Sequence, residues 1–149
     1  MASNLHACAV LLDDRGVLLC GPSGSGKTTL ALTLSDLARL HGLAARLVSD
    51  DQVWLAAGQD ARLIASAPSP IAGLVELRGF GPAPIISAPR MVVDLVVRLV
   101  EPGTAPRMAE AGREALAGCR VPSLSLPRHS AAASARAVLA ALGLGPFSG

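Results

Sequence analysis

A chain of 149 residues, of which 51% are hydrophobic, is long enough to form one domain with a substantial core. It contains two Phe, one Trp and no Tyr, which argues against a nucleic-acid-binding protein that stacks bases on exposed aromatic rings. The formal net charge of +2 is spread along the chain without a block of like charge, which argues against a phosphate-tracking stripe or a lipid-binding patch. We therefore expect a single domain over residues 1–149, with no nucleic-acid partner and no membrane partner.

The amino terminus and the cysteines bear on location. Met1–His6 has no basic region followed by a long apolar run, and charged residues interrupt every later apolar stretch before it reaches transmembrane length. This pattern predicts a cytoplasmic protein. Cys8, Cys20 and Cys119 lack the paired spacing of a zinc site, so we expect small buried thiols.

The first half of the chain alternates between strand and helix patterns. Residues 6–21 predict two short apolar strands in a hairpin that reverses at residues 13–16. A Gly-rich loop and a helix follow, running to about His41, with Gly42 as its left-handed terminator. Residues 44–51 predict a buried strand that ends in two carboxylates.

The middle of the chain is richer in Pro and Gly. Residues 52–58 and 61–67 predict two strands around a turn. Residues 66–89 contain too many helix and strand breakers for long elements, and we expect a loop-rich wall of an active site, interrupted by a strand at 74–79. Residues 91–100 predict one more strand.

Two helices are expected in the last third, at Arg107–Leu116 and Ala131–Leu142, with the segment CRVPSLSLP between them. We interpret Trp54 and His129 as structural. The alternation of strands and helices predicts an α/β protein.

A phosphate-binding motif lies between the second strand and the first helix. Gly21–Thr28 fits the pattern G-x-x-x-x-G-K-[ST], in the strand–loop–helix context of a P-loop, and contains the only lysine of the chain. Glycines let successive N–H groups point at phosphate oxygens, Lys27 supplies a point charge, and the Thr28 hydroxyl is suited to ligate Mg²⁺. A surface turn is the alternative, but the flanking elements favour a nucleoside triphosphate, ATP or GTP, with magnesium. The predicted nucleotide-binding residues are Gly21, Pro22, Ser23, Gly24, Ser25, Gly26, Lys27 and Thr28.

Two acidic residues follow the next strand. Asp50 and Asp51 stand at its carboxyl end, where an α/β sheet presents its ligands. Adjacent residues leaving a strand point to opposite sides, so one carboxylate can face a metal and the other an acceptor. A simple Ser-Asp-Asp turn is the alternative.

A third charged segment is LVELRGFGP, residues 74–82. In a strand Glu76 and Arg78 project to one face, which offers an acid for a metal and a cation for a transferring phosphoryl group. Taken alone, this pattern fits a solvent-facing ion pair equally well.

Four of these segments together resemble the HPr kinase/phosphorylase family, in the same order along the chain. They are HACAV from His6, GPSGSGKTT from Gly21, LVSDD from Leu47 and LVELRGFG from Leu74. The resemblance covers residues 5–81 well and residues 91–102 more loosely. The P-loop is shared by many proteins, whereas the RGFG segment and the position of the aspartate pair are much more specific.

The resemblance implies a P-loop fold of the HPr kinase and PEP carboxykinase type, with a mixed central sheet and flanking helices. It implies a kinase that uses ATP and Mg²⁺ to phosphorylate a serine of HPr, a small phosphocarrier protein, or of a nitrogen-related paralogue. The family's base then corresponds to Asp51, and His6 matches a functional histidine. Glu76 and Thr28 match the magnesium ligands, with Asp50 nearby.

The remaining catalytic candidates are two arginines. Arg78 is our candidate for stabilising charge in the transition state. Arg128 lies in a segment similar to the family's Pro/Arg segment and is a weaker match.

Two departures from the family are visible. The chain begins five residues before His6, so we expect the C-terminal catalytic domain alone, without the family's N-terminal domain. The family's C-terminal segment linked to dephosphorylation is not recognisable, which puts phosphorylase activity in doubt. The family also implies a homo-oligomer, a hexamer.

Two alternatives stay open. A small-molecule kinase would use the aspartates to bind an alcohol or a nucleotide. A non-catalytic nucleotide-binding regulator would use Asp51 as a sensor.

Overall fold

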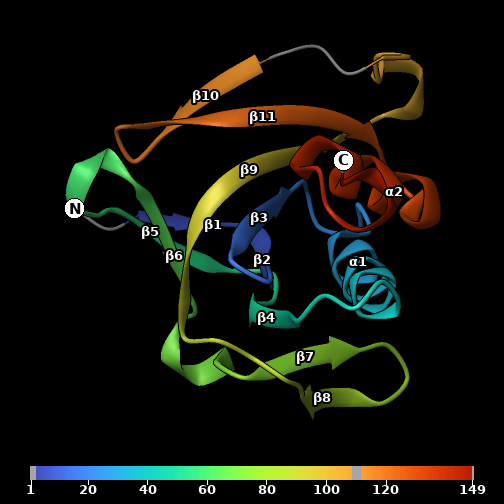
Figure 1. Ribbon diagram of the computed structural model, residues 1–149. Coiled ribbons are helices and arrows are strands. Elements are labelled where there is room, and N and C mark those ends of the chain that lie inside the picture. The colour runs from blue at the N-terminus through green and yellow to red at the C-terminus, as the bar shows by residue number, and fades with distance from the viewer. Residues whose placement is uncertain (1–2, 109–111, 149) are drawn as a thin grey trace.

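The structure is a computed structural model that describes residues 3–108 and 112–148. Its described residues form a curled nine-stranded sheet, a separate two-stranded hairpin and two α-helices (Figure 1). The strand order is β1-β5-β6-β9-β3-β2-β4, with β11 pairing to β9 and β10 to β11. The predicted α/β class, with a mixed sheet and flanking helices, is confirmed.

The amino-terminal hairpin forms as predicted. Strands β2 (Ala7–Leu12) and β3 (Arg15–Cys20) pair antiparallel around a two-residue turn. Both faces of these strands are buried, because alternate side chains enter two different hydrophobic clusters. The hairpin is therefore the centre of the molecule.

Helix α1 (Lys27–Leu40) follows the Gly-rich loop and ends where the sequence predicts. Gly42 continues the chain with φ +80°, a left-handed conformation that glycine adopts without strain. Strand β4 (Ala45–Ser49) then returns to the sheet and pairs antiparallel with β2. Since β3 is also antiparallel to β2, β4 and β3 run in the same direction.

The antiparallel arm of the sheet consists of three short strands: β1 (Ser3–Leu5), β5 (Val53–Ala57) and β6 (Leu63–Ser66). β5 pairs with both β1 and β6, as a hairpin with the predicted turn near Gly58. β6 joins this arm to the first residues of β9 (Arg90–Val100), which is the longest strand. The strands predicted at residues 52–58, 61–67 and 91–100 are confirmed as β5, β6 and β9, whereas β1 was not predicted.

The Pro/Gly-rich segment contains the small hairpin of β7 (Leu74–Leu77) and β8 (Gly81–Pro84), seen at the bottom of Figure 1. The prediction placed Arg78 within the strand, and this is wrong. The strand ends at Leu77 because Gly79 and Gly81, with φ of +86° and +103°, turn the chain back.

The helix predicted at Arg107–Leu116 is also wrong for the residues that are described. Gly112–Leu116 form strand β10, which pairs antiparallel with β11 (Cys119–Pro127). The turn between them has positive φ at both Ala117 and Gly118, the conformation that closes tight hairpins. Pairing with a neighbouring strand overrides the helical propensity of the Ala, Glu and Arg residues in this segment. Residues 109–111 of the predicted helix lie outside the described residues.

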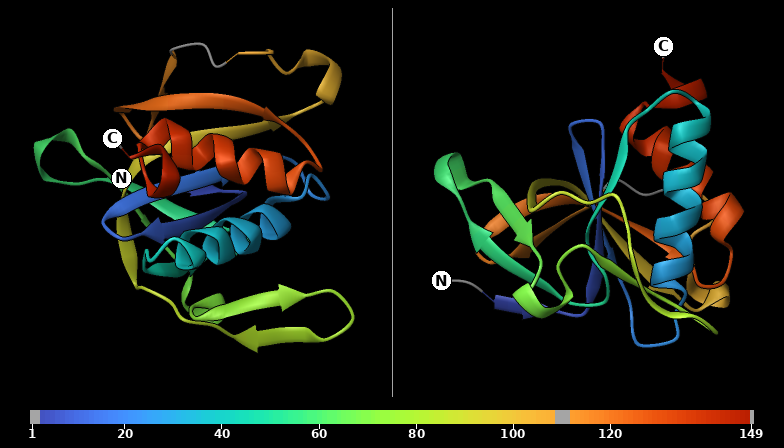
Figure 2. Two further views of the ribbon diagram at one scale, coloured as in Figure 1. Left: turned by 45° about the vertical axis from the view of Figure 1, so that its right-hand side comes forward. Right: turned by 90° about the horizontal axis from the view of Figure 1, so that it is seen from below.

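Helix α2 (Ala131–Leu142) is confirmed, and Gly143 ends it with φ +65°. α1 and α2 pack side by side on one face of the sheet, as both views in Figure 2 show. One hydrophobic cluster lies between these helices and the sheet, and a second fills the curl between the central strands and the β1-β5-β6 arm. Short 3₁₀ helices occur in the connections at Gln59–Ala61, Ser69–Ile71, Pro102–Thr104 and Gly145–Phe147.

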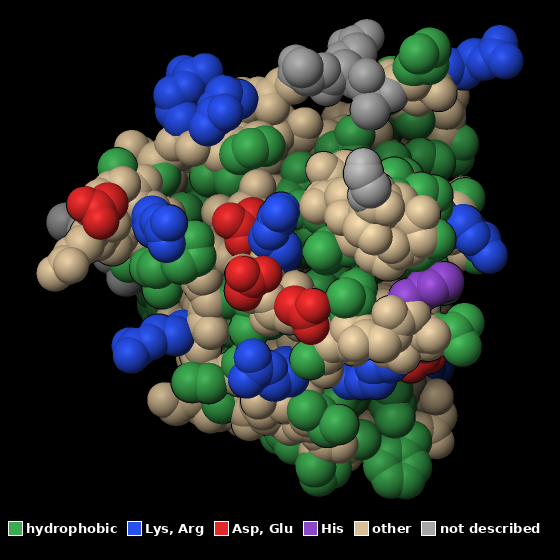
Figure 3. Space-filling model, viewed as in Figure 1, with side chains coloured by type: hydrophobic (Ala, Val, Ile, Leu, Met, Phe, Trp, Pro, Cys, Tyr) green, Lys and Arg blue, Asp and Glu red, His purple; other side chains and the backbone are tan. Residues whose placement is uncertain are grey.

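The surface carries charges of both signs. On the face shown in Figure 3, Lys and Arg side chains are interspersed with Asp, Glu and hydrophobic side chains. Within residues 3–108 and 112–148, no helix has both the length and the apolar character needed to cross a membrane.

Candidate functional site

The sheet brings the predicted site residues to one edge. β3 and β11 both run parallel to β9, and β4 runs parallel to β3, so four carboxyl ends open on the same side. The Gly-rich loop follows β3, the aspartate pair follows β4, and Arg128 follows β11. The carboxyl edge of parallel strands is where α/β proteins bind ligands.

The Gly-rich loop has the backbone conformation that its sequence predicts. Gly24 and Gly26 have φ of +78° and +92°, and Gly26 is the residue from which α1 begins. The Ser25 N–H donates to the Pro22 carbonyl at 3.1 Å, which closes the loop in front of the helix. The N–H groups of the first helical turn have no partners within the helix, and the helix dipole makes this end attractive to anions.

Lys27 is held inside this loop. Its side chain is 4% exposed, and Nζ donates to the carbonyls of Gly21 at 2.8 Å and Pro22 at 3.2 Å. Nζ also lies 3.4 Å from Oδ1 of Asp51. The single lysine is thus a buried cation that faces both the phosphate loop and an acid.

Asp50 is the buried member of the acidic pair. Its Oδ1 accepts a hydrogen bond from the Thr28 hydroxyl at 2.7 Å, and its Oδ2 accepts one from the Glu76 N–H at 2.9 Å. The Cys8 thiol donates to the same Oδ1 at 3.3 Å. Asp50 therefore connects the P-loop helix, the β7–β8 hairpin and strand β2.

Asp51 is the accessible member. Its side chain is 52% exposed, and its φ of +67° is uncommon for a non-glycine residue. This left-handed conformation turns the chain between two neighbouring carboxylates, so that Asp50 faces Thr28 while Asp51 faces Lys27. The two carboxylates thus face different partners, as the sequence predicts for adjacent residues that leave a strand.

An open cavity of about 1000 Å³ lies over these groups. Glu76 and Arg78 line it from the tip of the β7–β8 hairpin, opposite the P-loop. Its lining residues are Ser23, Gly24, Gly26, Lys27, Thr28, Thr29, Leu32, Asp50, Asp51, Glu76, Leu77, Arg78, Gly79, Phe80, Gly81 and His129. The volume is large enough for a small-molecule ligand of nucleotide size.

The remaining P-loop residues support the loop from behind. Gly21, Pro22 and Ser25 are not among the residues that line the cavity. A Cβ on Gly21 would come within 2.6 Å of Ser25 Oγ, so a larger residue here would have to displace the Ser25 side chain. Ser25 Oγ is buried and has no hydrogen-bond partner among the described residues.

The donor set fits Mg²⁺ shared with a phosphate ligand. Thr28, Asp50 and Glu76 offer oxygen atoms, which Mg²⁺ prefers, and all three line the cavity. Within the described part of the chain, no three His, Cys, Asp or Glu side chains cluster closely enough to hold a metal ion. Mg²⁺ commonly needs only one or two protein carboxylates when phosphates complete its coordination, so two acids and a hydroxyl suffice.

Two predicted catalytic residues lie outside the cavity lining. His6 is exposed, in the bend between β1 and β2, next to Ala7, whose N–H donates to the Asp51 carbonyl at 3.1 Å. Arg128 forms an ion pair with Glu101, with Nη1 and Oε1 2.8 Å apart. The structure therefore places both beside the site, but not among its lining residues.

Sequence reasoning missed several residues in and beside the cavity, of which His129 and Cys8 bear most directly on its polar groups. His129, interpreted as structural, lines the cavity next to Gly26. The sequence places His129 shortly after the strand β11. That β11 ends at the same edge of the sheet as the P-loop becomes visible only in the structure, where β11 pairs with β9.

The second is Cys8. Burial raises the pKa of its thiol to about 12, and the Asp50 carboxylate adds to this effect. The thiol is therefore a neutral donor to Asp50 at physiological pH. The predicted hairpin could have indicated this position, because antiparallel pairing sets the start of β2, which contains Cys8, beside the end of β3, where the P-loop begins.

Comparison with protein families gives one match over nearly the whole chain. The family model described as HPr Serine kinase C-terminal domain matches residues 1–141. The resemblance inferred from the four sequence segments is confirmed by this match.

Two similar relatives are both named HPr kinase/phosphorylase. The protein of Limosilactobacillus reuteri (strain DSM 20016) is 38% identical over 78 residues, which are 52% of this chain and 22% of the relative. That of Listeria welshimeri is 40% identical over 78 residues, 52% of this chain and 23% of the relative. The aligned part thus spans less than a quarter of the length of these relatives.

A solved structure described as the Hpr(Ser) kinase/phosphatase from Coxiella burnetii is similar over a larger share. It superposes with a TM-score of 0.76 at 26% identity, covering 92% of this chain and 93% of that one. The predicted fold type is confirmed by this likeness.

Proposed function

The chain belongs to the family of the HPr serine kinase C-terminal domain, and from this premise we propose that it is a kinase that uses ATP and Mg²⁺ to phosphorylate a serine of an HPr-type phosphocarrier protein. The observation that carries this proposal is the position of one acid. Asp51 lies 3.4 Å from the P-loop lysine, accessible to solvent and inside the large cavity. A regulator needs the loop but not an accessible acid beside it.

The phosphate end of ATP binds at the start of α1 in this proposal. Backbone N–H groups of Gly24, Gly26 and Lys27 surround the β- and γ-phosphates, and the helix dipole adds to the attraction. The Lys27 ammonium, which now donates to two loop carbonyls, turns to the phosphate oxygens. Because it is already buried, it loses little hydration when it does so.

Asp51 accepts the proton of the carrier serine. The serine oxygen forms a bond to the γ-phosphorus as the bond to the bridging oxygen of ADP breaks, and the hydroxyl proton passes to the Asp51 carboxylate. Lys27 beside Asp51 holds the carboxylate in place before the carrier arrives. ADP and phosphoserine are the products.

Thr28, Asp50 and Glu76 would hold the magnesium ion, with Asp50 kept in place by its hydrogen bonds to Thr28 and to the Glu76 backbone. When bound, the ion neutralises charge on the phosphates. Arg78, at the tip of the β7–β8 hairpin, is our candidate for contacting the transferring phosphoryl oxygens. His6 and Arg128 are proposed to act from the border of the site, by contacting the carrier.

The test is a transfer assay with a matched control. The protein is incubated with γ-labelled ATP, Mg²⁺ and an HPr-type carrier, and the labelled residue is identified by mass spectrometry. We expect label on a carrier serine, loss of label in Asp51→Asn, and ATP binding retained in that variant. The control is Asp60→Asn, because Asp60 is also an exposed acid with positive φ, at +60°, but lies outside the cavity.

Other outcomes would contradict the proposal. Label found only on a metabolite would indicate a small-molecule kinase. ATP binding without transfer to any acceptor would indicate a regulator.

The phosphorylase reaction is tested on the phosphorylated carrier. Attack of inorganic phosphate on the phosphoserine would release pyrophosphate, with Asp51 returning the proton to the serine.

The proposal also includes a cytoplasmic homo-oligomer, a hexamer in line with the resemblance. Sedimentation equilibrium of the purified protein tests the oligomer. A monomer at all concentrations would contradict that part alone.

A further inference from the structure

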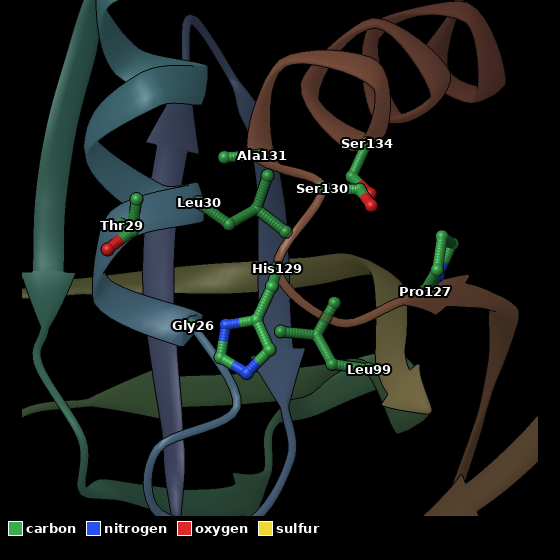
Figure 4. A pocket seen from close by; sticks show the side chains of 9 residues that line it. All are labelled: Gly26, Thr29, Leu30, Leu99, Pro127, His129, Ser130, Ala131 and Ser134. Atoms are coloured by element: carbon green, nitrogen blue, oxygen red, sulfur yellow. The ribbon is translucent and has the colours of Figure 1, made fainter. Parts of the chain in front are cut away.

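A second, smaller cavity adjoins the large one. It measures about 210 Å³ and lies between α1, α2 and the ends of β9 and β11 (Figure 4). Gly26, Thr29 and His129 line both cavities, so the two meet at the start of α1. The volume is below the roughly 300–1,000 Å³ of sites that enclose a whole drug-sized ligand, and it suits a single ring system.

The walls of this second cavity combine apolar side chains with hydroxyl groups and one imidazole. Leu30 enters from α1, Leu99 from the end of β9 and Pro127 from the end of β11 (Figure 4). No Asp, Glu, Lys or Arg is among the lining residues. A charged phosphate would gain nothing here, whereas a flat heterocycle would remove apolar surface from water.

One polar group in the cavity has no protein partner. Ser134 is 3% exposed, and its Oγ has no hydrogen-bond partner among the described residues. Its side chain extends from the first turn of α2 toward the wall of Leu99 and Pro127 (Figure 4). A buried hydroxyl normally finds a partner, so an orphan hydroxyl that lines a cavity points to a ligand with a polar edge.

His129 stands at the boundary between the two cavities. A Cβ placed on Gly26 would lie 3.5 Å from His129 Nδ1, so the imidazole packs over the P-loop glycine. Its φ of +57° is a left-handed conformation that non-glycine residues adopt rarely. Such backbone outliers occur where the position of a side chain matters.

We propose that the smaller cavity binds the purine base of the nucleotide, with Ser134 Oγ bonded to a ring nitrogen and the His129 imidazole packed against the base or its sugar. This inference rests on the proposed function, since it assumes that the triphosphate binds to the P-loop. A triphosphate held at Gly24–Thr28 must direct its nucleoside end away from the loop. The smaller cavity begins at Gly26, on the side away from Asp51 and the β7–β8 hairpin, which leaves the other side free for the carrier.

Calorimetric titration of the purified protein with two magnesium-loaded probes, ATP and inorganic tripolyphosphate, separates base binding from phosphate binding. We expect His129→Gly and Ser134→Leu to weaken ATP binding by about tenfold, the loss of one stacking or packing contact to a base. Tripolyphosphate affinity should stay within about twofold, because the P-loop is untouched. Glycine at position 129 suits the positive φ, and leucine at position 134 fills the cavity.

Matched controls are available on the same elements. Ala133→Leu adds the same side chain to an exposed position of α2, and it should leave both affinities unchanged. Should Ser134→Leu fail to fold, as judged by its thermal melt, His129→Gly on the exposed loop still gives the answer.

The results of these titrations distinguish failure of the base-site proposal from failure of the kinase proposal. Unchanged ATP affinity in His129→Gly and in folded Ser134→Leu would overturn the inference, and so would an equal loss for ATP and tripolyphosphate. A wild-type protein that binds neither probe would overturn the nucleotide-dependent function together with it. Selective loss of ATP binding, in a protein that fails to phosphorylate any carrier, would leave the base site standing and remove the kinase proposal alone.

Discussion

The two rims of the site differ in kind. On the rim formed by the P-loop and the end of β4, the charged side chains contact one another and their neighbours. Lys27 faces Asp51, and Asp50 accepts hydrogen bonds from Thr28 and from the β7–β8 hairpin. On the rim formed by the β11–α2 loop, the one charge, Arg128, is paired with Glu101 outside the cavity lining. Charged side chains are therefore concentrated on one side of the site, whereas the other side offers apolar side chains and hydroxyl groups.

The largest effect is expected on the charged rim. Lys27→Ala should lower carrier phosphorylation by about 1,000-fold, because it removes the buried cation beside Asp51 that is proposed to contact the phosphates. Lys27→Arg should restore little of this, since a planar guanidinium does not fit between the Gly21 and Pro22 carbonyls. Initial rates of label transfer measure both variants. Full activity in the arginine variant would contradict this, because it would show that the positive charge is sufficient without the hydrogen bonds to the Gly21 and Pro22 carbonyls.

Substitution of two arginines, Arg78 in the cavity lining and Arg128 in the β11–α2 loop, compares the contributions of the two sides of the site. Arg78→Ala should lower the transfer rate by about 100-fold, because this side chain lines the cavity. Arg128→Ala should change the rate by no more than about twofold at saturating carrier, because its guanidinium is paired with Glu101 and does not line the cavity. The measurement is kcat and KM for the carrier in each variant. A larger loss for Arg128→Ala would mean that Arg128 leaves Glu101 and enters the site.

Asp50 should matter for stability as well as for transfer. Asp50→Ala removes a buried carboxylate and leaves the partly buried Thr28 hydroxyl and Glu76 N–H without their acceptor, which costs about 1–3 kcal/mol of unfolding free energy. Urea denaturation measures this cost. Asp51→Ala, at the exposed neighbouring position, is the matched control and should cost clearly less. Equal losses would contradict the division of the pair into a buried support and an accessible acid.

The smallest expected effect concerns pH. Burial raises the pKa of Cys8 to about 12 and that of Cys20 to about 11, from an ordinary value of 9.0. Unfolded thiols lose their protons from about pH 9 upward, while the folded ones keep theirs, so stability is complete below that pH and declines above it. Unfolding free energies at about pH 8 and about pH 10 should show the decline, and Cys8→Ala should reduce its slope by up to about 1.4 kcal/mol per pH unit. An unchanged slope would contradict the raised pKa.

Local signals explain why the first half of the chain is predictable. The turn after Leu12, the glycines before Lys27 and the left-handed Gly42 each specify their own segment, so the hairpin, the P-loop and α1 follow from short stretches of sequence. The acidic pair is predictable for the same reason, because it directly ends a buried strand. Adjacency predicts that the two carboxylates face different ways, but which of them is buried depends on the left-handed conformation of Asp51, which no motif predicts.

The last third depends on contacts between distant segments. β10 has helix-forming residues and becomes a strand only because β11 lies beside it, and β11 in turn pairs with β9. The position of His129 depends on this whole arrangement, so no motif predicts it. The ion pair of Arg128 with Glu101 likewise joins the ends of two strands that meet only in the sheet.

In the proposed mechanism, Asp51 takes the serine proton while the P-loop holds ATP. The most direct test is a single-turnover measurement of phosphoryl transfer to the carrier, with the ATP dissociation constant measured in parallel, for wild type, Asp51→Asn and Asp60→Asn. We predict that Asp51→Asn slows transfer by about 1,000-fold with ATP affinity changed by less than about threefold, while Asp60→Asn matches wild type. Transfer at the wild-type rate in Asp51→Asn, with ATP bound, would contradict the account.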